Sequence, residues 1–197
     1  MELSAPQQQA LMNLARDVIR RALSGQSTAV PPPADPLLQQ RAGCFVSLHR
    51  SGTHRLRGCV GRIEATGPLW DTVAATSVNV LQDPRFGNDR ITLEELPLLE
   101  IELSVLTPLQ HAANPLDFDP KVHGLYLLCC GRTGCFLPQV GRETGWTREQ
   151  LLARLCTEKM GLPPTFWMQA GAVLMTFTAM VIGPEPLDVP AGQMVAP

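Results

Sequence analysis

Apolar residues recur at spacings of three and four in three stretches of the chain, which is the pattern of amphipathic helices. Each stretch begins at a proline or a capping residue and ends at a glycine or an Asp-Pro pair. In the third stretch, Thr147 and Gln150 have the spacing of a capping box, and Gly161 favours a left-handed stop. The predicted helices run from Pro6 to Gly25, from Pro68 to Asp83 and from Thr147 to Gly161.

Other stretches favour strands, because they are rich in apolar and β-branched residues and lie between glycine-containing turns. The clearest is 99–105, where aliphatic residues alternate with Glu100, Glu102 and Ser104. This period of two places both glutamates on the face opposite the core. Two pairs of the strands are predicted to form hairpins. The predicted strands are 44–49 with 56–61, 99–105, 125–130 with 135–137, and 172–182.

Two proline-rich stretches interrupt these patterns. Residues 26–36 include Pro31-Pro32-Pro33 and predict an extended internal linker, and residues 184–197 predict a disordered tail. The strands come in hairpins with helices between them, so the predicted fold class is α+β with a mixed or antiparallel sheet. We expect one domain over 5–183, built of two lobes.

Length and charge exclude several classes of protein. A chain of 197 residues allows one compact domain or two small lobes that share a core. The formal charge is −2, so no overall field attracts a nucleic-acid backbone or an anionic membrane. The chain contains neither an apolar run of about 20 residues nor the start of a secretory signal. We therefore predict a cytoplasmic protein that binds neither nucleic acid nor membrane.

The six cysteines contain no Cys-x-x-Cys pair, which argues against a disulfide framework and a zinc site and predicts reduced thiols. With a four-residue loop, Cys130 would face Cys135 across the second hairpin and could form a redox disulfide with it; two buried thiols are the alternative. The loop from Gly131 to Gly134 matches a nucleic-acid-clamping pattern only weakly, because it joins strands and the chain is 5% aromatic. No spacing indicates a metal site or a cofactor.

Cys59 is the first candidate for chemistry. If the loop of the first hairpin spans 50–54, Ser47 opposes Arg57 and Phe45 opposes Cys59. Ser47, Arg57 and Cys59 then share one face of the hairpin. A guanidinium two residues away favours the thiolate form of a cysteine, so we predict that Arg57 activates the Cys59 thiol.

The residues around this thiol allow a functional and a structural interpretation. Gly58 and Gly61 lack side chains and would let a ligand approach the backbone. The alternative is a small buried cysteine beside a glycine bulge. A nucleophilic thiol also needs a base, for which His49 on the same predicted face is the first candidate. A solvent-exposed histidine at a strand end is the alternative interpretation of His49.

Charged residues elsewhere add further candidates. Glu100 and Glu102 are predicted either as a general acid/base pair or as a solvated sheet face. Arg85, in the segment 83–86, is predicted to bind an anion or to pair with Glu102. The alternative is a structural turn held in place by Phe86.

Several of these segments occur together in one known family. Leu56–Gly61 reads Leu-Arg-Gly-Cys-Val-Gly, and 137–140 reads Leu-Pro-Gln-Val. Other matching segments are Phe45–Leu48, Asp83–Phe86, Glu102–Leu106, His123–Leu125 and Gly145-Trp146. With these motifs the chain resembles the AMMECR domain family, called protein A of the AmmeMemoRadiSam system in microbes. The resemblance extends from about Ala10 to Gly183.

The resemblance implies an α+β fold of two unequal lobes, with the signature strand lining a cleft between them. It also implies two partners, a Memo-like relative of extradiol dioxygenases and a radical-SAM protein, and it implies no particular cofactor. Arg57-Gly58-Cys59 carries over as the family signature. Arg85, Glu102 and Gln139 carry over as pattern positions without an assigned role.

Residues and resemblance together predict an enzyme, or a component of one, that acts on a small organic or peptide substrate. Cys59 is the predicted thiolate, Arg57 activates it or holds an anionic group, and Glu102 is the acid/base. The predicted binding positions are Ser47, Gly58, Gly61, Arg85 and Gln139. The alternative is a non-catalytic adaptor, or a subunit that presents a substrate to the two partners, with the signature as its recognition surface.

Overall fold

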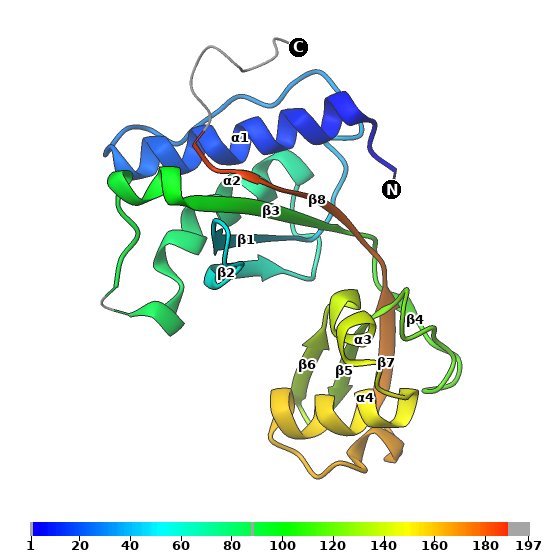
Figure 1. Cartoon of the computed structure of the whole chain (residues 1–197). Helices are drawn as coiled ribbons and strands as arrows, with labels where there is room; N and C mark the ends of the chain where they lie inside the picture. Colours follow the sequence, from blue (N-terminus) through cyan, green and yellow to red (C-terminus); the bar gives the residue numbers. More distant parts are fainter. Residues whose placement is uncertain (1, 88, 189–197) are drawn as a thin grey trace. The chain divides into compact units, whose positions relative to one another are not determined.

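The computed structural model describes residues 2–87 and 89–188, and the chain divides into two compact units of unequal size. The first unit contains the residues up to Leu106 together with those from Met180 onward, and the second is Thr107–Ala179. Each unit has its own sheet, whose strands are labelled in Figure 1, and each sheet has four strands. Each unit also has its own hydrophobic core. The predicted α+β class is therefore confirmed.

The first unit combines a sheet of order β2-β1-β3-β8 with two helices. Its strands are β1 (Cys44–Arg50), β2 (Leu56–Arg62), β3 (Leu99–Leu106) and β8 (Ala179–Pro186). Its helices are α1 (Ala5–Leu23) and α2 (Leu69–Asn79), with the 3₁₀ turns η1 (Val80–Gln82), η2 (Pro84–Phe86) and η3 (Leu93–Leu98). β1 lies at the centre and pairs antiparallel with both β2 and β3.

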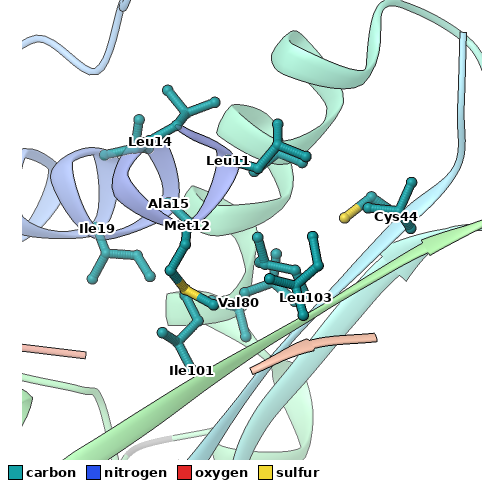
Figure 2. Packing of buried hydrophobic residues seen from close by; sticks show 14 of the residues in the cluster. Leu11, Met12, Leu14, Ala15, Ile19, Cys44, Val80, Ile101 and Leu103 are labelled. Atoms are coloured by element: carbon teal, nitrogen blue, oxygen red, sulfur yellow. The ribbon is translucent and has the colours of Figure 1, made fainter. Parts of the chain in front are cut away.

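Apolar residues of α1 and alternate residues of the strands form the core of the first unit. Leu11 and Met12 of α1 lie in one buried cluster with Ile101 and Leu103 of β3 (Figure 2). The alternation over 99–105 therefore has the predicted effect, because the aliphatic residues face the helices while Glu102 faces the other side of the sheet.

The second unit has a sheet of order β4-β7-β5-β6 and its own helices. Its strands are β4 (Gln110–His111), β5 (Gly124–Cys129), β6 (Arg132–Phe136) and β7 (Val173–Phe177). Its helices are α3 (Pro138–Thr144), α4 (Arg148–Arg154), the π-helical turn η4 (Leu155–Lys159) and the 3₁₀ turn η5 (Phe166–Met168). The sequence pattern did not predict α3, which begins at the proline of the Leu-Pro-Gln-Val motif.

The three predicted helices are confirmed. Ser4 caps α1 in a capping box, and the helix continues until the chain turns at Gly25, where φ is +67°. The second predicted helix comprises α2 and η1. Thr147 and Gln150 form the predicted capping box of α4, and Gly161, with φ +61°, follows η4. Among the described residues, no helix combines the length and the apolar character needed to cross a membrane.

The second hairpin has a shorter turn than predicted. Cys129 pairs with Arg132, so that only Cys130 and Gly131 form the turn. Cys135 pairs with Tyr126, and the predicted opposition of Cys130 and Cys135 is therefore wrong. Both turn residues have positive φ, +54° and +70°, as a tight two-residue hairpin turn requires. This turn replaces the four-residue loop that would place Cys130 opposite Cys135.

The single strand predicted over 172–182 is also wrong. The stretch divides into β7, which belongs to the sheet of the second unit, and β8, which belongs to that of the first. At Thr178, between the two strands, the backbone N–H donates to Oγ1 of Thr107 at 2.9 Å. Side chains alternate with a period of two residues in every strand. The sequence pattern therefore does not show that the chain passes from one sheet to the other.

The disordered tail predicted from 184 is contradicted for residues 184–188. Pro184 to Pro186 belong to β8, and Arg16 of α1 forms an ion pair with Glu185 at 2.7 Å. Leu187 is 2% exposed, and its N–H donates to the carbonyl oxygen of Leu99 at 2.8 Å. Residues 189–197 of the predicted tail lie outside the described residues.

The predicted linker over 26–36 contains neither helix nor strand, as expected, but it is anchored within the first unit. The indole Nε1 of Trp70 donates to the carbonyl oxygen of Val30 at 3.1 Å. The side-chain amide of Gln7 donates to Asp35 at 2.9 Å. Contacts with both helices therefore hold the linker in place.

Leu187 gives a direct test of this docked C-terminal segment. We expect Leu187→Ala to lower the free energy of unfolding by about 2–4 kcal/mol, because it removes a buried side chain from the core. Leu98→Ala is the matched control, since Leu98 is 57% exposed, and it should change stability by less than about 0.5 kcal/mol. Urea denaturation measures both values, and equal midpoints would contradict the docking of Leu187.

Candidate functional site

Three polar side chains lie in one row across the sheet of the first unit. Ser47 on β1 is directly opposite Cys59 on β2 and Glu102 on β3. Directly opposed residues of antiparallel strands project from the same face, with Cβ atoms about 5 Å apart. Val46 and Leu48, next to Ser47 in sequence, are buried on the other face with the helices. The row therefore lies on the face of the sheet opposite the α1 and α2 core.

The predicted register of this hairpin is wrong by two residues. Ser47 opposes Cys59 and not Arg57, and Phe45 opposes Gly61 and not Cys59. The register shifts next to His49, which leaves Arg57 as an extra, bulged residue. A shift of two preserves the faces of a strand, so Ser47 and Cys59 still share one face, as predicted.

The Cys59 thiol is half-buried and contacts Ser47, whose hydroxyl donates to the sulfur at 3.2 Å. His49 pairs with Glu100 across β1 and β3, one row away from Ser47. His54 contacts Glu100 instead, with 3.6 Å between its Nδ1 atom and a carboxylate oxygen. In the part of the chain that the structure describes, neither histidine forms a hydrogen bond with the sulfur, whereas the hydroxyl of Ser47 lies 3.2 Å from it.

Two side chains from the turn after α2 bind the Cys59 peptide. The N–H of Cys59 donates to Oδ2 of Asp83 at 2.9 Å, and Nη2 of Arg85 donates to the Cys59 carbonyl oxygen at 2.8 Å. Asp83 and Arg85 also form an ion pair at 2.6 Å. Because β2 is an edge strand, these side chains satisfy backbone groups that a neighbouring strand would otherwise bind.

The charges of this pair are mutually stabilised. The hydrogen bond from Arg85, helped by the N–H groups of Cys59 and Arg85, lowers the pKa of Asp83 to about 2. Asp83 in turn raises the pKa of Arg85, and Cys59 adds a smaller contribution through its side chain. Arg85 is therefore the cation that binds Cys59, through the carbonyl oxygen of that residue, and the Arg85 side chain is 56% exposed.

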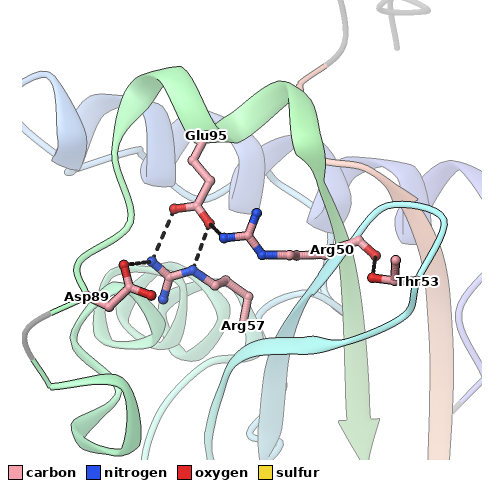
Figure 3. Close-up of polar contacts among 5 residues, drawn as sticks. All are labelled: Arg50, Thr53, Arg57, Asp89 and Glu95. Carbon is pink, nitrogen blue, oxygen red and sulfur yellow. Dashed lines mark hydrogen bonds and ion pairs between the residues drawn. The ribbon is translucent and has the colours of Figure 1, made fainter.

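Arg57 has different partners from those predicted. Its guanidinium is 4% exposed and donates to both carboxylate oxygens of Glu95, at 2.7 and 3.1 Å (Figure 3). Asp89 lies 3.3 Å from the same guanidinium, and these carboxylates, Glu95 first, raise the pKa of Arg57. Arg50 also binds Glu95, at 3.0 Å. The charge of Arg57 is thus directed at carboxylates, and among the described residues no hydrogen bond or ion pair joins it to the Cys59 thiol.

A cavity of about 290 Å³ lies beside these groups within the first unit. Its wall includes Arg57, Asp83 and Phe86, together with residues of η1 and the segment after η2. The Phe86 ring lies 5.7 Å from the Arg57 guanidinium carbon and 5.9 Å from that of Arg85. Asp83 therefore contributes both to the Cys59 contacts and to the cavity wall.

The two signature glycines are explained by close packing. A Cβ atom at Gly61 would lie 2.2 Å from the ring of Phe45, which is opposite it on β1. A Cβ atom at Gly58 would lie 3.0 Å from the carbonyl oxygen of Val80 in η1. These contacts account for both glycines without a ligand.

The two remaining candidates, Gln139 and Glu102, lie in different units. Gln139 lies in α3 and belongs to the second unit, whereas Cys59 belongs to the first. Glu102 lies in the same row as Ser47 and makes contacts of its own. Within residues 2–87 and 89–188, no group of three or more His, Cys, Asp or Glu side chains is placed to hold a metal ion.

A family model described as AMMECR1 matches residues 12–182 of the chain. The chain belongs to the AMMECR1 family. It is 35% identical to protein MK0488 of Methanopyrus kandleri, with 93% of this chain and 91% of the relative covered. It is 34% identical to protein MJ0810 of Methanocaldococcus jannaschii, with 85% of both chains covered.

The fold of this AMMECR1 family member is also that of a solved structure. The crystal structure of protein PH0010 from Pyrococcus horikoshii matches with a TM-score of 0.77 and 34% sequence identity. The match covers 88% of this chain and 89% of that chain. The family resemblance expected from the motifs is thereby confirmed.

Sequence reasoning missed two residues of the site, Asp83 and Glu95. Asp83 had a signal, since an aspartate before a proline is a typical helix-capping residue, and it accepts from the N–H of Arg85 at the start of η2. Glu95 lies 38 residues from Arg57 and had no signal, because a bidentate ion pair between distant segments leaves no local pattern.

Asp83→Asn should remove the ion pair while leaving an oxygen that can accept from the Cys59 N–H. We expect a loss of about 1–2 kcal/mol in unfolding free energy near neutral pH. The folded-state pKa of Asp83 is depressed from 3.8 to about 2, so its contribution is fully present above about pH 4. It is lost as the pH falls toward 2, and the difference between the two proteins should shrink there.

Denaturant titrations of both proteins over this pH range measure the effect. A constant difference from pH 7 to the acid limit would show that the charge of Asp83 does not stabilise the fold. Glu143→Gln is a control, since Glu143 is exposed on α3 and lies in the other unit.

Proposed function

We propose that this AMMECR1 family protein is an enzyme, or a component of one, that uses the Cys59 thiol on a small organic or peptide substrate. Cys59 acts as the nucleophile, and Arg85 stabilises its negative charge or holds an anionic group of the substrate. The observation that supports this most directly is the half-buried sulfur, which accepts from the Ser47 hydroxyl at 3.2 Å, while the guanidinium of Arg85 binds the carbonyl oxygen of the same residue at 2.8 Å. Hydrogen-bond donors and cations beside a sulfur favour its thiolate form.

The row of Cys59, Ser47 and Glu102 also supports a route for the proton. Ser47 contacts the sulfur, and Glu102 is the residue opposite Ser47 on the next strand. A hydroxyl can accept one proton while it donates another. In the proposed mechanism the Ser47 hydroxyl turns toward Glu102, and the thiol proton passes to the Ser47 oxygen as the Ser47 proton passes to the Glu102 carboxylate. The hydroxyl that results then donates to the thiolate.

Arg57 and the cavity are assigned to substrate binding. The guanidinium of Arg57 is immobilised by Glu95 and Asp89, so it forms a rigid polar wall next to Phe86. The cavity of about 290 Å³ suits a small organic group or one side chain of a peptide. The partners that we propose, a Memo-like protein and a radical-SAM protein, rest on the family resemblance alone.

Alkylation with iodoacetamide near neutral pH tests the proposed thiol chemistry. We expect Cys59 to react faster than a free cysteine, and Arg85→Gln to slow it by about three- to tenfold, because the developing thiolate loses its cation. Arg85→Lys should retain part of the rate, and Arg57→Gln should slow Cys59 less than Arg85→Gln does. Peptide mass spectrometry after timed quenching gives the rate of each cysteine separately.

The other thiols of the chain provide internal references. Burial raises the pKa of Cys44 to about 12, so Cys44 should stay unmodified as long as the protein is folded. If Cys59 reacts no faster than a free cysteine, or only together with Cys44 on unfolding, the proposed nucleophile is wrong.

An exposed apolar surface favours the second candidate function, a non-catalytic adaptor or substrate-presenting subunit. Leu93 and Leu98 are 40% and 57% exposed on η3, the same turn that carries Glu95. Exposed apolar side chains contribute to protein contacts where they form a contiguous patch. The adaptor would bind its partner through these leucines rather than through the thiol.

Copurification with a Memo-like protein separates the two functions. For an adaptor we expect Leu98→Asp to weaken retention of the partner by about tenfold, since it places a charge in the apolar contact, while Cys59→Ser retains the partner fully. Retention that survives Cys59→Ser, combined with an unreactive Cys59, would decide for the adaptor. A wild-type protein that retains no partner would decide against it.

A further inference from the structure

Two adjacent cysteines meet in the tight turn between β5 and β6. The sulfur atoms of Cys129 and Cys130 lie 3.4 Å apart. Cys129 is the last residue of β5 and is buried, whereas Cys130 is exposed in the turn. This pair therefore joins a thiol that solvent reagents can reach to a thiol that they cannot reach directly.

The backbone of the turn places Cys130 in an uncommon conformation. Its φ is +54°, and that of Gly131 is +70°. Tight hairpin turns with positive φ at both positions usually carry asparagine, aspartate or glycine at the first of them. A cysteine there has a backbone cost that ordinary turn residues avoid, and its sulfur lies against that of Cys129.

The surroundings assign different roles to the two thiols. Burial, and to a smaller extent Cys130 and Cys156, raise the pKa of Cys129, so Cys129 is held as a neutral thiol. Its sulfur also lies 3.5 Å from the carbonyl oxygen of Phe166. Burial raises the pKa of Cys135, the partner suggested by the sequence, to about 12, and Cys135 pairs with Tyr126. Cys130 is thus the exposed thiol that can react first with a reagent from solvent, and Cys129 is the buried thiol next to it.

We propose that Cys129 and Cys130 form a redox modification site, at which a small-molecule disulfide converts them into an intramolecular disulfide between adjacent residues. The Cys130 thiolate attacks a sulfur of the small disulfide, which forms a mixed disulfide and releases one small thiol. The Cys129 thiol, after losing its proton to water, attacks the Cys130 sulfur and displaces the second small thiol. Two protein thiols are oxidised, and one small disulfide is reduced to two thiols.

The geometry makes this modification readily reversible. The Cα atoms of adjacent residues are about 3.8 Å apart, below the range of about 4.4–6.8 Å that is usual for disulfides. The ring that closes between them is therefore strained, and strained, exposed disulfides are the more easily reduced ones. The existing contact between the sulfurs favours ring closure over a lasting mixed disulfide.

Incubation of the full chain with oxidised glutathione tests the proposal. Free thiols are first alkylated. The disulfides are then reduced, and the thiols that are released are alkylated with an isotopically heavier reagent. The peptide containing Cys129 and Cys130 is analysed by mass spectrometry. We expect this peptide to lose two hydrogen atoms, to carry no glutathione and to regain both thiols with dithiothreitol. Cys129→Ser should instead stop at a glutathione adduct on Cys130, and Cys130→Ser should leave Cys129 unmodified.

Control variants separate this pair from the other thiols. Cys135→Ser and Cys156→Ser should form the same product, and so should Cys59→Ser, because the reaction does not depend on the proposed nucleophile. Circular dichroism checks that each variant is folded. A disulfide from Cys130 to Cys135 or Cys156, a stable glutathione adduct on wild-type Cys130, or an unreacted pair would each overturn the proposal.

Discussion

The hydrogen bonds that Asp83 and Arg85 make with the Cys59 backbone are the interactions on which the site in the first unit depends. Without them, the outer side of β2 would present a bare N–H and a bare carbonyl at the position of the thiol. The same aspartate lines the cavity, and the ring of Phe86 lies against the guanidinium groups of both Arg57 and Arg85. One short turn therefore determines where the sulfur, the exposed cation and the cavity wall lie.

Local patterns predicted most of the secondary structure, because capping residues and the period of apolar positions act within a few residues. They were insufficient wherever a distant segment decides the outcome. The proline-rich composition after 183 predicted disorder, yet Leu187 enters the core and Arg16 binds Glu185 across 169 residues of sequence. Likewise, nothing local shows that the chain changes sheets at Thr178.

The site was predicted in part for the same reason. The face shared by Ser47 and Cys59 followed from alternation alone, so an error of two residues in register did not affect it. The partner of the thiol did depend on register, and the bulge at Arg57 turned that guanidinium to Glu95 and Asp89. Arg85 was singled out by its motif, but its contact with Cys59 comes from the fold of the turn rather than from any spacing along the chain.

The second unit is inserted between β3 and β8, which are neighbours in the sheet of the first unit. Near the ends of the insertion, the N–H of Thr107 donates to the carbonyl oxygen of Thr178 at 3.0 Å, and the N–H of Thr178 donates to Oγ1 of Thr107 at 2.9 Å. Once the insertion has folded, the two ends that continue into β3 and β8 are held next to each other. Pairing β3 with β8 then no longer requires the closure of a long flexible loop. The entropic cost of this pairing is therefore that of a much shorter connection.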